Sequence, residues 1–443
     1  MFRSRLGAAD RRVIRLAIPA FGTLAAEPLY RLVDTAIVGR LGTDQLAGLA
    51  IAVSVLGLVV AGSNFLAYGT TEQVARRLGA GDASGGATVG MQAMWLSIGV
   101  GLVAAPVLVL VARPLSIVLG ADGEVLDVAV EYLRISAIGI PFVLIALAAQ
   151  GVQRGASDYT TPLAILVVSN VINVAVEPVL VFGFDLGVAG AAWSTVLAQS
   201  VAGVAFLVTV RSRLAEAAHR RPVWSVMRPL VTAGKYLLLR VGSMLAVFTG
   251  STAVAARVDD PTLAAHQVCI SLFFFLALTL DALAVPAQTL VAEELGRGDR
   301  ATAKRLADRV VVLSILTATV VAVLLAVASP LLARAFSPDP AVVSRATSGL
   351  VVLALLMLPG AVAFAYDGVL IGAGDYRFLG RAAFGYLLAV IPIAMVVLAT
   401  PSLGIVGIWG GLTFWMTLRA VVNHVHCDRL LTPGVAPGMS GVR

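Results

Sequence analysis

Long apolar segments recur along the whole chain, separated by short polar stretches. A run of about 20 predominantly apolar residues is long enough to cross the hydrocarbon core of a bilayer as an α-helix. The pattern therefore predicts an all-α polytopic membrane protein with twelve transmembrane helices. Their approximate bounds are 14–40, 46–69, 88–112, 128–152, 160–184, 188–210, 230–256, 263–290, 309–333, 345–371, 378–399 and 403–425.

Basic residues gather in every second connection between these segments. Arg76 and Arg77 follow the second span, Arg377 and Arg381 follow the tenth, and the basic stretch 211–235 joins the sixth to the seventh. Because short cytoplasmic loops carry an excess of Lys and Arg, these connections are expected on the cytoplasmic side. Both termini are then cytoplasmic, in a multi-pass protein of the inner (plasma) membrane whose main partner is the lipid bilayer.

The composition agrees with a membrane protein and argues against several other classes of protein. The 443 residues are 59% hydrophobic and only 13% charged, against about 25% in soluble domains. The net charge of +7 lies in short loops, so it is a topology signal and predicts no nucleic-acid partner. Two distant cysteines and four histidines predict neither a disulfide framework nor a metal cluster. Without a P-loop or a zinc-protease motif, we expect no enzyme activity and no cofactor.

The two halves of the chain repeat one another. Three pairs of short stretches match at one offset of 217 residues. They predict a duplicated six-helix unit, and an even number of spans makes the two copies parallel. We expect an N-terminal lobe over 1–212, a cytoplasmic linker over 213–229 and a C-terminal lobe over 230–443, around a central cavity. The matches are "ARRLGAGD" at 75–82 with "AEELGRGD" at 292–299, "GVQRGASDY" at 151–159 with "GVLIGAGDY" at 368–376, and "LGVAG" at 186–190 with "LGIVG" at 403–407.

Several intramembrane polar or charged residues are replaced in the other copy by apolar or uncharged residues, so the two lobes have specialised. Thr195 is the weaker case, because a one-residue slip would match it to Thr413 instead of Leu412. The pairs are Asp34 with Ser251, Asn173 with Val390, Glu177 with Ala394, Thr195 with Leu412, Asp281 with Asn64 and Asp367 with Gln150.

One stripe of polar side chains follows the fifth span. Asn170, Asn173 and Glu177 are spaced i, i+3 and i+7, so they share one helix face, and Pro178 follows them. A carboxylate with two amides on one face is a candidate site for a cation or a proton. The alternative is a hydrogen-bond network that only joins helices.

A second stripe lies in the first span, where Glu27, Arg31 and Asp34 are spaced i, i+4 and i+7. Arg31 is placed to neutralise one acid and leave the other free to titrate. Ionisable residues within a span are functional candidates by default. The alternative is a fully paired structural triad.

The C-terminal half has its own intramembrane charges. Arg240 in the seventh span is expected to pair with Asp281 or Asp367 at a similar depth. Intramembrane charges usually pair with one another, so we expect an ion pair or a gate here.

"VDTAIVGRLG" in the first span, "NVAVEP" in the fifth and the "LGAGD" and "LGRGD" loops resemble the multidrug and toxic compound extrusion (MATE) family, and its DinF-like branch in particular. The resemblance covers essentially the whole chain. It implies a secondary antiporter that exports small cationic or amphiphilic compounds in exchange for H⁺ or Na⁺, by alternating access.

The resemblance also implies a site in the N-terminal lobe. Asp34, Asn173, Glu177 and Thr195 match its cation- or proton-coupling residues, which would also hold Na⁺, and Tyr30 matches a nearby aromatic residue of the first span. The acid of the fifth span is usually aspartate in this motif, whereas this chain has the longer glutamate.

Two other functions stay open at this stage. A lipid-linked precursor flippase of the same superfamily is the nearer alternative, although those proteins often have fourteen spans and a basic cavity. A channel is less consistent, because the chain shows no repeated selectivity-filter segment. A monomer is expected.

Overall fold

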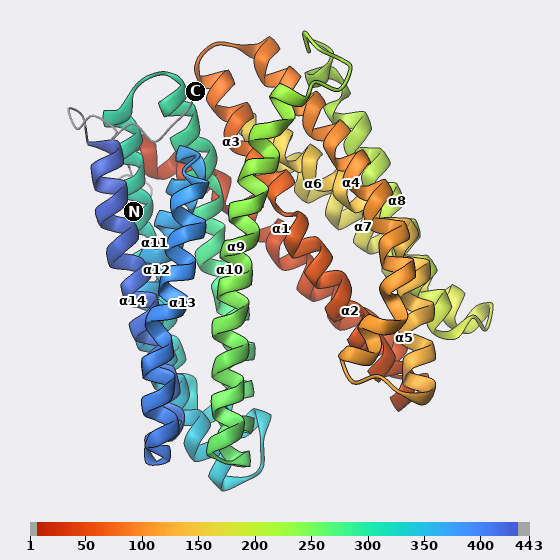
Figure 1. Ribbon diagram of the computed structural model, residues 1–443, viewed down its shortest axis with the longest axis vertical. Coiled ribbons are helices and arrows are strands. Elements are labelled where there is room, and N and C mark those ends of the chain that lie inside the picture. The colour runs from red at the N-terminus through yellow and green to blue at the C-terminus, as the bar shows by residue number, and fades with distance from the viewer. Residues whose placement is uncertain (1–6, 433–443) are drawn as a thin grey trace. The chain divides into compact units, whose positions relative to one another are not determined.

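The computed structural model describes residues 7–432, and over this range the chain is helical with short connections and no strand (Figure 1). The first half contains α1 (Ala8–Val38), α2 (Thr43–Ser63), α3 (Phe65–Gly79), α4 (Ala83–Val118), α5 (Gly123–Ser136), η2 (Ala137–Gly139), α6 (Ile140–Gly155), α7 (Thr160–Pro178), η3 (Val179–Gly183) and α8 (Gly187–Leu214). The second half contains α9 (Trp224–Val258), α10 (Asp260–Gly296), α11 (Arg300–Phe336), α12 (Pro340–Ala373), α13 (Tyr376–Ala399), η4 (Pro401–Leu403) and α14 (Gly404–Leu431).

Within residues 7–432, eleven helical segments are long and apolar enough to span a membrane. The one expected span missing from these eleven is the first, 14–40, which falls on α1; this helix is long enough but carries Glu27, Arg31 and Asp34 among its apolar residues. Several helices extend well beyond their predicted apolar bounds. The predicted span 46–69, for example, lies within one segment over Thr43–Gly79. Hydropathy detects only the part of a helix that matches the bilayer, so the polar helix ends were missed.

Over the described residues the helices form two compact units, one of residues 22–234 and the other of residues 7–21 and 235–432. This division differs from the expected lobes in two respects. The boundary falls between residues 234 and 235, inside α9 and five residues after the expected start of the C-terminal lobe at 230, and the first part of α1 belongs to the second unit. The first helix of each repeat is thus shared between the units.

Polar contacts hold the start of α1 within the second unit. Both carboxylate oxygens of Asp10 accept hydrogen bonds from Arg309, at 2.7 and 2.6 Å. Arg12 forms an ion pair with Glu293 at 2.5 Å. These contacts explain why residues near the N-terminus pack with the second copy of the repeat.

The structure confirms the internal repeat. Helices α8 and α14 begin at Gly187 and Gly404 and end at Leu214 and Leu431, so both ends keep the offset of 217 residues. At this offset Thr195 corresponds to Leu412.

Both copies use the same close helix packing. A Cβ on Gly151 would lie 2.7 Å from the Thr70 side chain, and a Cβ on Gly368 would lie 2.3 Å from the Ala284 carbonyl oxygen. Small residues four apart let membrane helices approach closely, which accounts for the repeated "GVQRG" and "GVLIG". Helix α6 thereby packs on α3, and α12 packs on α10.

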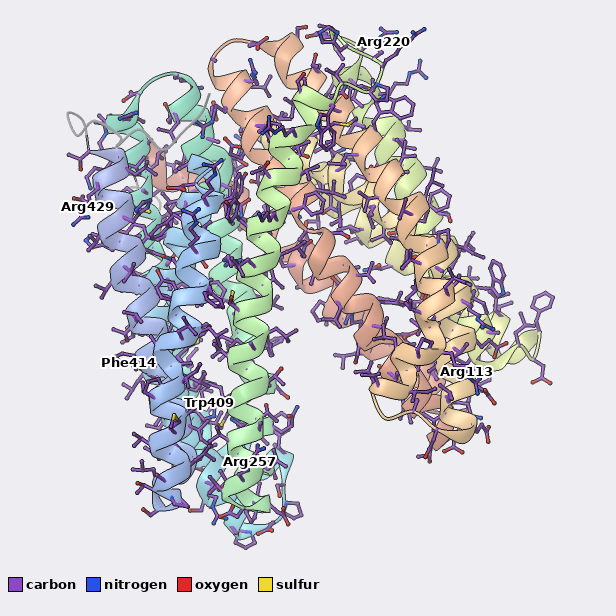
Figure 2. The ribbon with its side chains drawn as sticks, viewed as in Figure 1. Arg113, Arg220, Arg257, Trp409, Phe414 and Arg429 are labelled. Atoms are coloured by element: carbon purple, nitrogen blue, oxygen red, sulfur yellow. The ribbon has the colours of Figure 1, made fainter. Side chains whose placement is uncertain are left out.

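The connection between the two halves, expected over 213–229, is short in the structure and is bound to the unit of residues 22–234. Between α8 and α9 the chain runs over 215–223, and its backbone bonds to side chains of α4. Gln92 donates to the carbonyls of His219 and Arg221, at 3.2 and 2.9 Å, and Trp95 donates to that of Arg220 at 2.8 Å. Figure 2 labels Arg220 at this end of the unit.

Candidate functional site

The first site lies in the unit of residues 22–234, where α1 and α7 bring two acids together. Asp34 is 3% exposed and Glu177 is fully buried. Their carboxyl groups lie close enough to interact electrostatically. Helix α7 ends at Pro178 and continues as the wider π-helical turn η3, a feature frequent at functional sites. The two acids predicted from separate spans therefore form one pair.

Thr195 of α8 is the centre of the hydrogen-bond network beside this pair. Its Oγ1 lies 2.8 Å from Tyr30 Oη, 3.5 Å from Tyr132 Oη and 3.4 Å from Asn173 Nδ2. The Asn173 amide nitrogen also lies 3.5 Å from Ser194 Oγ. Four helices, α1, α5, α7 and α8, thus contribute to one polar centre.

Several oxygens of this centre have no hydrogen-bond partner among the described residues. They are Asp34 Oδ1, Asn173 Oδ1 and both carboxylate oxygens of Glu177, all buried. An unpartnered buried oxygen is costly, by about 1–3 kcal/mol and more for a charged group. Acceptors without donors favour a bound cation, which can be a proton on a carboxyl group or a metal ion between the oxygens.

Three other predicted members of the site lie outside this centre. Glu27 and Arg31 form an ion pair at 2.5 Å with both side chains well exposed, at 58% and 42%. Asp34 has no ion pair within 4.0 Å among the described residues, so Arg31 neutralises Glu27 rather than Asp34. Asn170 donates to the carbonyl oxygen of Ala26 at 3.2 Å and joins α7 to α1.

The second cluster lies in the other unit and surrounds Asp367 of α12. Oδ2 of Asp367 accepts from Arg240 at 2.5 Å and from Arg419 at 2.6 Å, and Oδ1 accepts from Asn423 at 2.8 Å. Tyr386 donates to Asn423 Oδ1 at 2.9 Å. Of the two acids expected to pair with Arg240, Asp367 does so, and Asp281 has no ion pair within 4.0 Å among the described residues.

Five residues of these two centres were not selected from the sequence: Tyr132, Ser194, Tyr386, Arg419 and Asn423. Arg419 and Asn423 carried a visible signal, since an arginine and an amide four residues apart lie within the twelfth predicted span. Tyr132 and Ser194 carried none, because their role follows only from how the helices pack.

Comparison with known proteins agrees with this architecture. The MatE family model matches residues 19–179 and 239–396. The chain is 31% identical over 431 residues to Protein DETOXIFICATION 44, chloroplastic, of Arabidopsis thaliana, covering 94% of this chain and 82% of that protein. It is 25% identical to DNA damage-inducible protein F of Escherichia coli, covering 94% and 91%.

Solved structures show the same fold. A MATE protein in a bent conformation superposes with a TM-score of 0.89 at 20% identity, covering 96% of each chain. An outward-facing multidrug resistance MATE transporter superposes with a TM-score of 0.87, covering 96% of this chain and 97% of that one. The resemblance drawn from the sequence motifs is thereby confirmed, and the chain belongs to the MatE family of membrane transporters.

Proposed function

We propose that this protein is a secondary antiporter that exports small cationic or amphiphilic compounds, driven by a gradient of H⁺ or Na⁺. The observation that carries the proposal is the buried pair of Asp34 and Glu177, whose free oxygens face no donor. Relatives support the substrate class, since the Thermotoga maritima relative, 24% identical, is named a probable multidrug resistance protein.

The acid pair suits a monovalent cation. Two buried carboxylates close together repel one another strongly, because the local dielectric constant is low. A proton shared between them, or Na⁺ among Asp34, Glu177, Asn173 and Thr195, relieves this repulsion.

Ion binding would be coupled to substrate release through the helices that meet at this pair. A ligand shifts a conformational equilibrium only through different affinities for the two states. Asp34 lies on α1, which belongs in part to each unit, and Glu177 lies on α7. Neutralising the pair would change the attraction of a cationic substrate and the packing of α1 on α7 together. The proposal includes alternating access, in which the substrate site opens to one side of the membrane at a time.

The basic connections support a location in the inner (plasma) membrane with both termini in the cytoplasm. A monomer is sufficient for ion binding, because both acids of the pair belong to one unit of one chain. Cysteines introduced into 215–223 and into the opposite loop at 119–122 test the orientation. A membrane-impermeant maleimide applied to intact cells should label only the second position.

Transport in proteoliposomes tests the coupling role. A fluorescent cation should leave wild-type vesicles when a pH or Na⁺ gradient is imposed, and Asp34→Asn and Glu177→Gln should abolish that response. Asp127→Asn is the matched control, because Asp127 is an acid of the same unit whose side chain is 75% exposed. Gradient-driven transport that survives in both site variants would contradict the proposal.

A further inference from the structure

A polar pocket lies in the unit of residues 22–234, at the end of α7 opposite Glu177. Its volume is ≈ 510 Å³, within the range of about 300–1,000 Å³ that is typical of ligand sites. The end of α6, the loop before α7, the start of α7 and the end of α8 surround it. The lining combines carboxylates, one guanidinium group, hydroxyl groups and an amide, from Asp158, Glu216, Arg213, Thr161, Thr209 and Gln153.

Gln153 contributes a buried hydrogen-bond acceptor to this pocket. Its Nε2 lies 2.8 Å from Thr209 Oγ1, and Thr209 donates its only hydroxyl proton to the carbonyl oxygen of Phe206 at 3.0 Å. The Thr209 oxygen must therefore accept from the Gln153 amide nitrogen, which fixes the orientation of that amide. Oε1 of Gln153 then has no partner among the described residues, although the residue is only 1% exposed. Such an oxygen favours a bound donor group.

The second copy of the repeat fills the equivalent space with two rings. His426 lies 2.8 Å from Asp375 and stacks on Phe378, with the ring centroids 3.6 Å apart. The first copy keeps the aspartate but replaces both rings by hydroxyl residues, so the fold does not require a pocket here. At the offset of 217 residues, the pairs are Asp158 with Asp375, Thr161 with Phe378, Thr209 with His426, Gln153 with Leu370 and Arg213 with Leu430.

The pocket adjoins an apolar surface that faces the lipid. Thr161 of α7 and Ser212 of α8 lie at the ends of two predicted spans, and these helices pack against each other (Figure 1). Val168 follows Thr161 by two turns, Val208 precedes Ser212 by one turn, and the two valines are 56% and 67% exposed. A polar pocket at the end of such a helix pair matches the headgroup and the acyl chains of one phospholipid.

We infer that this pocket binds a phospholipid whose headgroup carries a primary ammonium group, as phosphatidylethanolamine does. Arg213 is placed for the phosphate, since guanidinium groups bind phosphate oxygens well. Glu216 and the free Oε1 of Gln153 are acceptors for the N–H donors of the ammonium group. A choline headgroup has no N–H to donate, and a purely anionic headgroup meets the carboxylates of Asp158 and Glu216 without a cation between them.

Native mass spectrometry of the purified, delipidated protein tests this site without any gradient, so the result does not depend on the acid pair of α1 and α7. Dioleoyl phosphatidylethanolamine should bind about tenfold more tightly than dioleoyl phosphatidylcholine or dioleoyl phosphatidylglycerol, because only it makes the charged hydrogen bonds to the acceptors. Glu216→Gln and Arg213→Met should each remove most of this preference.

Two matched variants serve as controls. Arg211→Met removes an exposed arginine from the same end of α8, and Asp308→Asn removes an acid of the other unit whose side chain is 52% exposed. Neither residue lines the pocket, so both variants should keep the wild-type preference. If these controls lose the preference as fully as Glu216→Gln and Arg213→Met do, the lipid recognises surface charge in general and the inference is wrong.

Thr161→Phe combined with Thr209→His copies the filling that the second copy already uses around Asp375. This double variant should fold with a melting temperature near that of wild type and lose the preference for phosphatidylethanolamine. Equal binding of the three lipids by wild type, or a preference that survives in the double variant, would overturn the inference. Glycerophosphoethanolamine has the headgroup without acyl chains and should compete only weakly. Full displacement of the lipid by an equal concentration of it would show that the occupant is a soluble zwitterion.

Discussion

The hydroxyl groups of Tyr30 and Thr195 lie 2.8 Å apart and join α1 to α8. Tyr30 is one turn before Asp34 on α1, and Thr195 also contacts Asn173 of α7. This hydrogen bond therefore connects α1, which carries Asp34, to the network that includes α7, which carries Glu177. Its loss should affect coupling without removing either acid.

Thr195→Val should lower gradient-driven export about fivefold, because one hydrogen bond contributes about 1 kcal/mol net. Thr195→Ser keeps a hydroxyl group and should transport close to the wild-type rate. The measurement is the initial rate of dye export from proteoliposomes at matched protein content. Equal rates for the two variants would show that the hydroxyl has no part in coupling.

Glu177→Asp should weaken ion binding while leaving the protein folded. The side chain becomes one methylene shorter, which withdraws its carboxyl group from Asp34 and reduces the interaction of the pair. We expect the ion concentration for half-maximal export to change at least threefold, measured by varying the outer pH and Na⁺ separately. An unchanged dependence on both ions would mean that the longer glutamate is not required for this geometry.

Asp367→Ala should destabilise the protein more than Arg240→Ala. Without Asp367, two buried guanidinium groups lose their shared partner, a loss that costs about 3–5 kcal/mol. Without Arg240, Asp367 still has Arg419 and Asn423, at 2.6 and 2.8 Å. Thermal unfolding in detergent measures both, and a larger loss for Arg240→Ala would refute this order.

Asp158 caps the start of α7 and predicts a pH dependence. Burial raises the pKa of its carboxyl group, but hydrogen bonds from the amide and hydroxyl groups of Thr161, with further help from Thr160 and Arg213, outweigh it and lower the pKa. A group whose folded-state pKa is lowered stabilises the protein above the ordinary carboxyl range, and this contribution is lost as the pH falls through the lowered pKa.

Asp158→Ala should therefore cost about 1 kcal/mol at neutral pH and progressively less in acid. Asp158→Asn keeps a cap but does not titrate, so it should remove the pH dependence with little loss at neutral pH. Melting temperatures between neutral pH and pH 3 compare the three proteins. A constant difference between wild type and Asp158→Ala across this range would rule out the ionised cap.

Much of the fold was predictable because each membrane-spanning helix requires a long apolar segment, which is visible in the sequence. Apolar length gives the spans, and the repeated "GVQRG" and "GVLIG" reflect close helix contacts that both copies need. The division into units was not predictable. It places the start of α1 with the second copy through Asp10 and Arg309, a long-range pair that no local pattern reveals.

The candidate site was predictable in part, because helix spacing and polar residues within apolar segments can be seen in the sequence. The stripe of Asn173 and Glu177 follows from helix spacing alone, and Asp34 stands out as an acid in an apolar segment. Spacing also predicted that Arg31 neutralises one of the two acids on its helix face but did not say which, and the structure pairs Arg31 with Glu27. Which member of a shared helix face is buried depends on the neighbouring helices, so the sequence of one helix does not decide it.

The central claim is that Asp34 and Glu177 together bind the coupling ion. Asp34→Asn preserves size but cannot change charge, so its effect on gradient-driven export in proteoliposomes tests the claim most directly. The account predicts a folded protein with wild-type melting behaviour and no export in response to a pH or Na⁺ gradient. Export by Asp34→Asn at the wild-type rate, with the wild-type ion dependence, would contradict it.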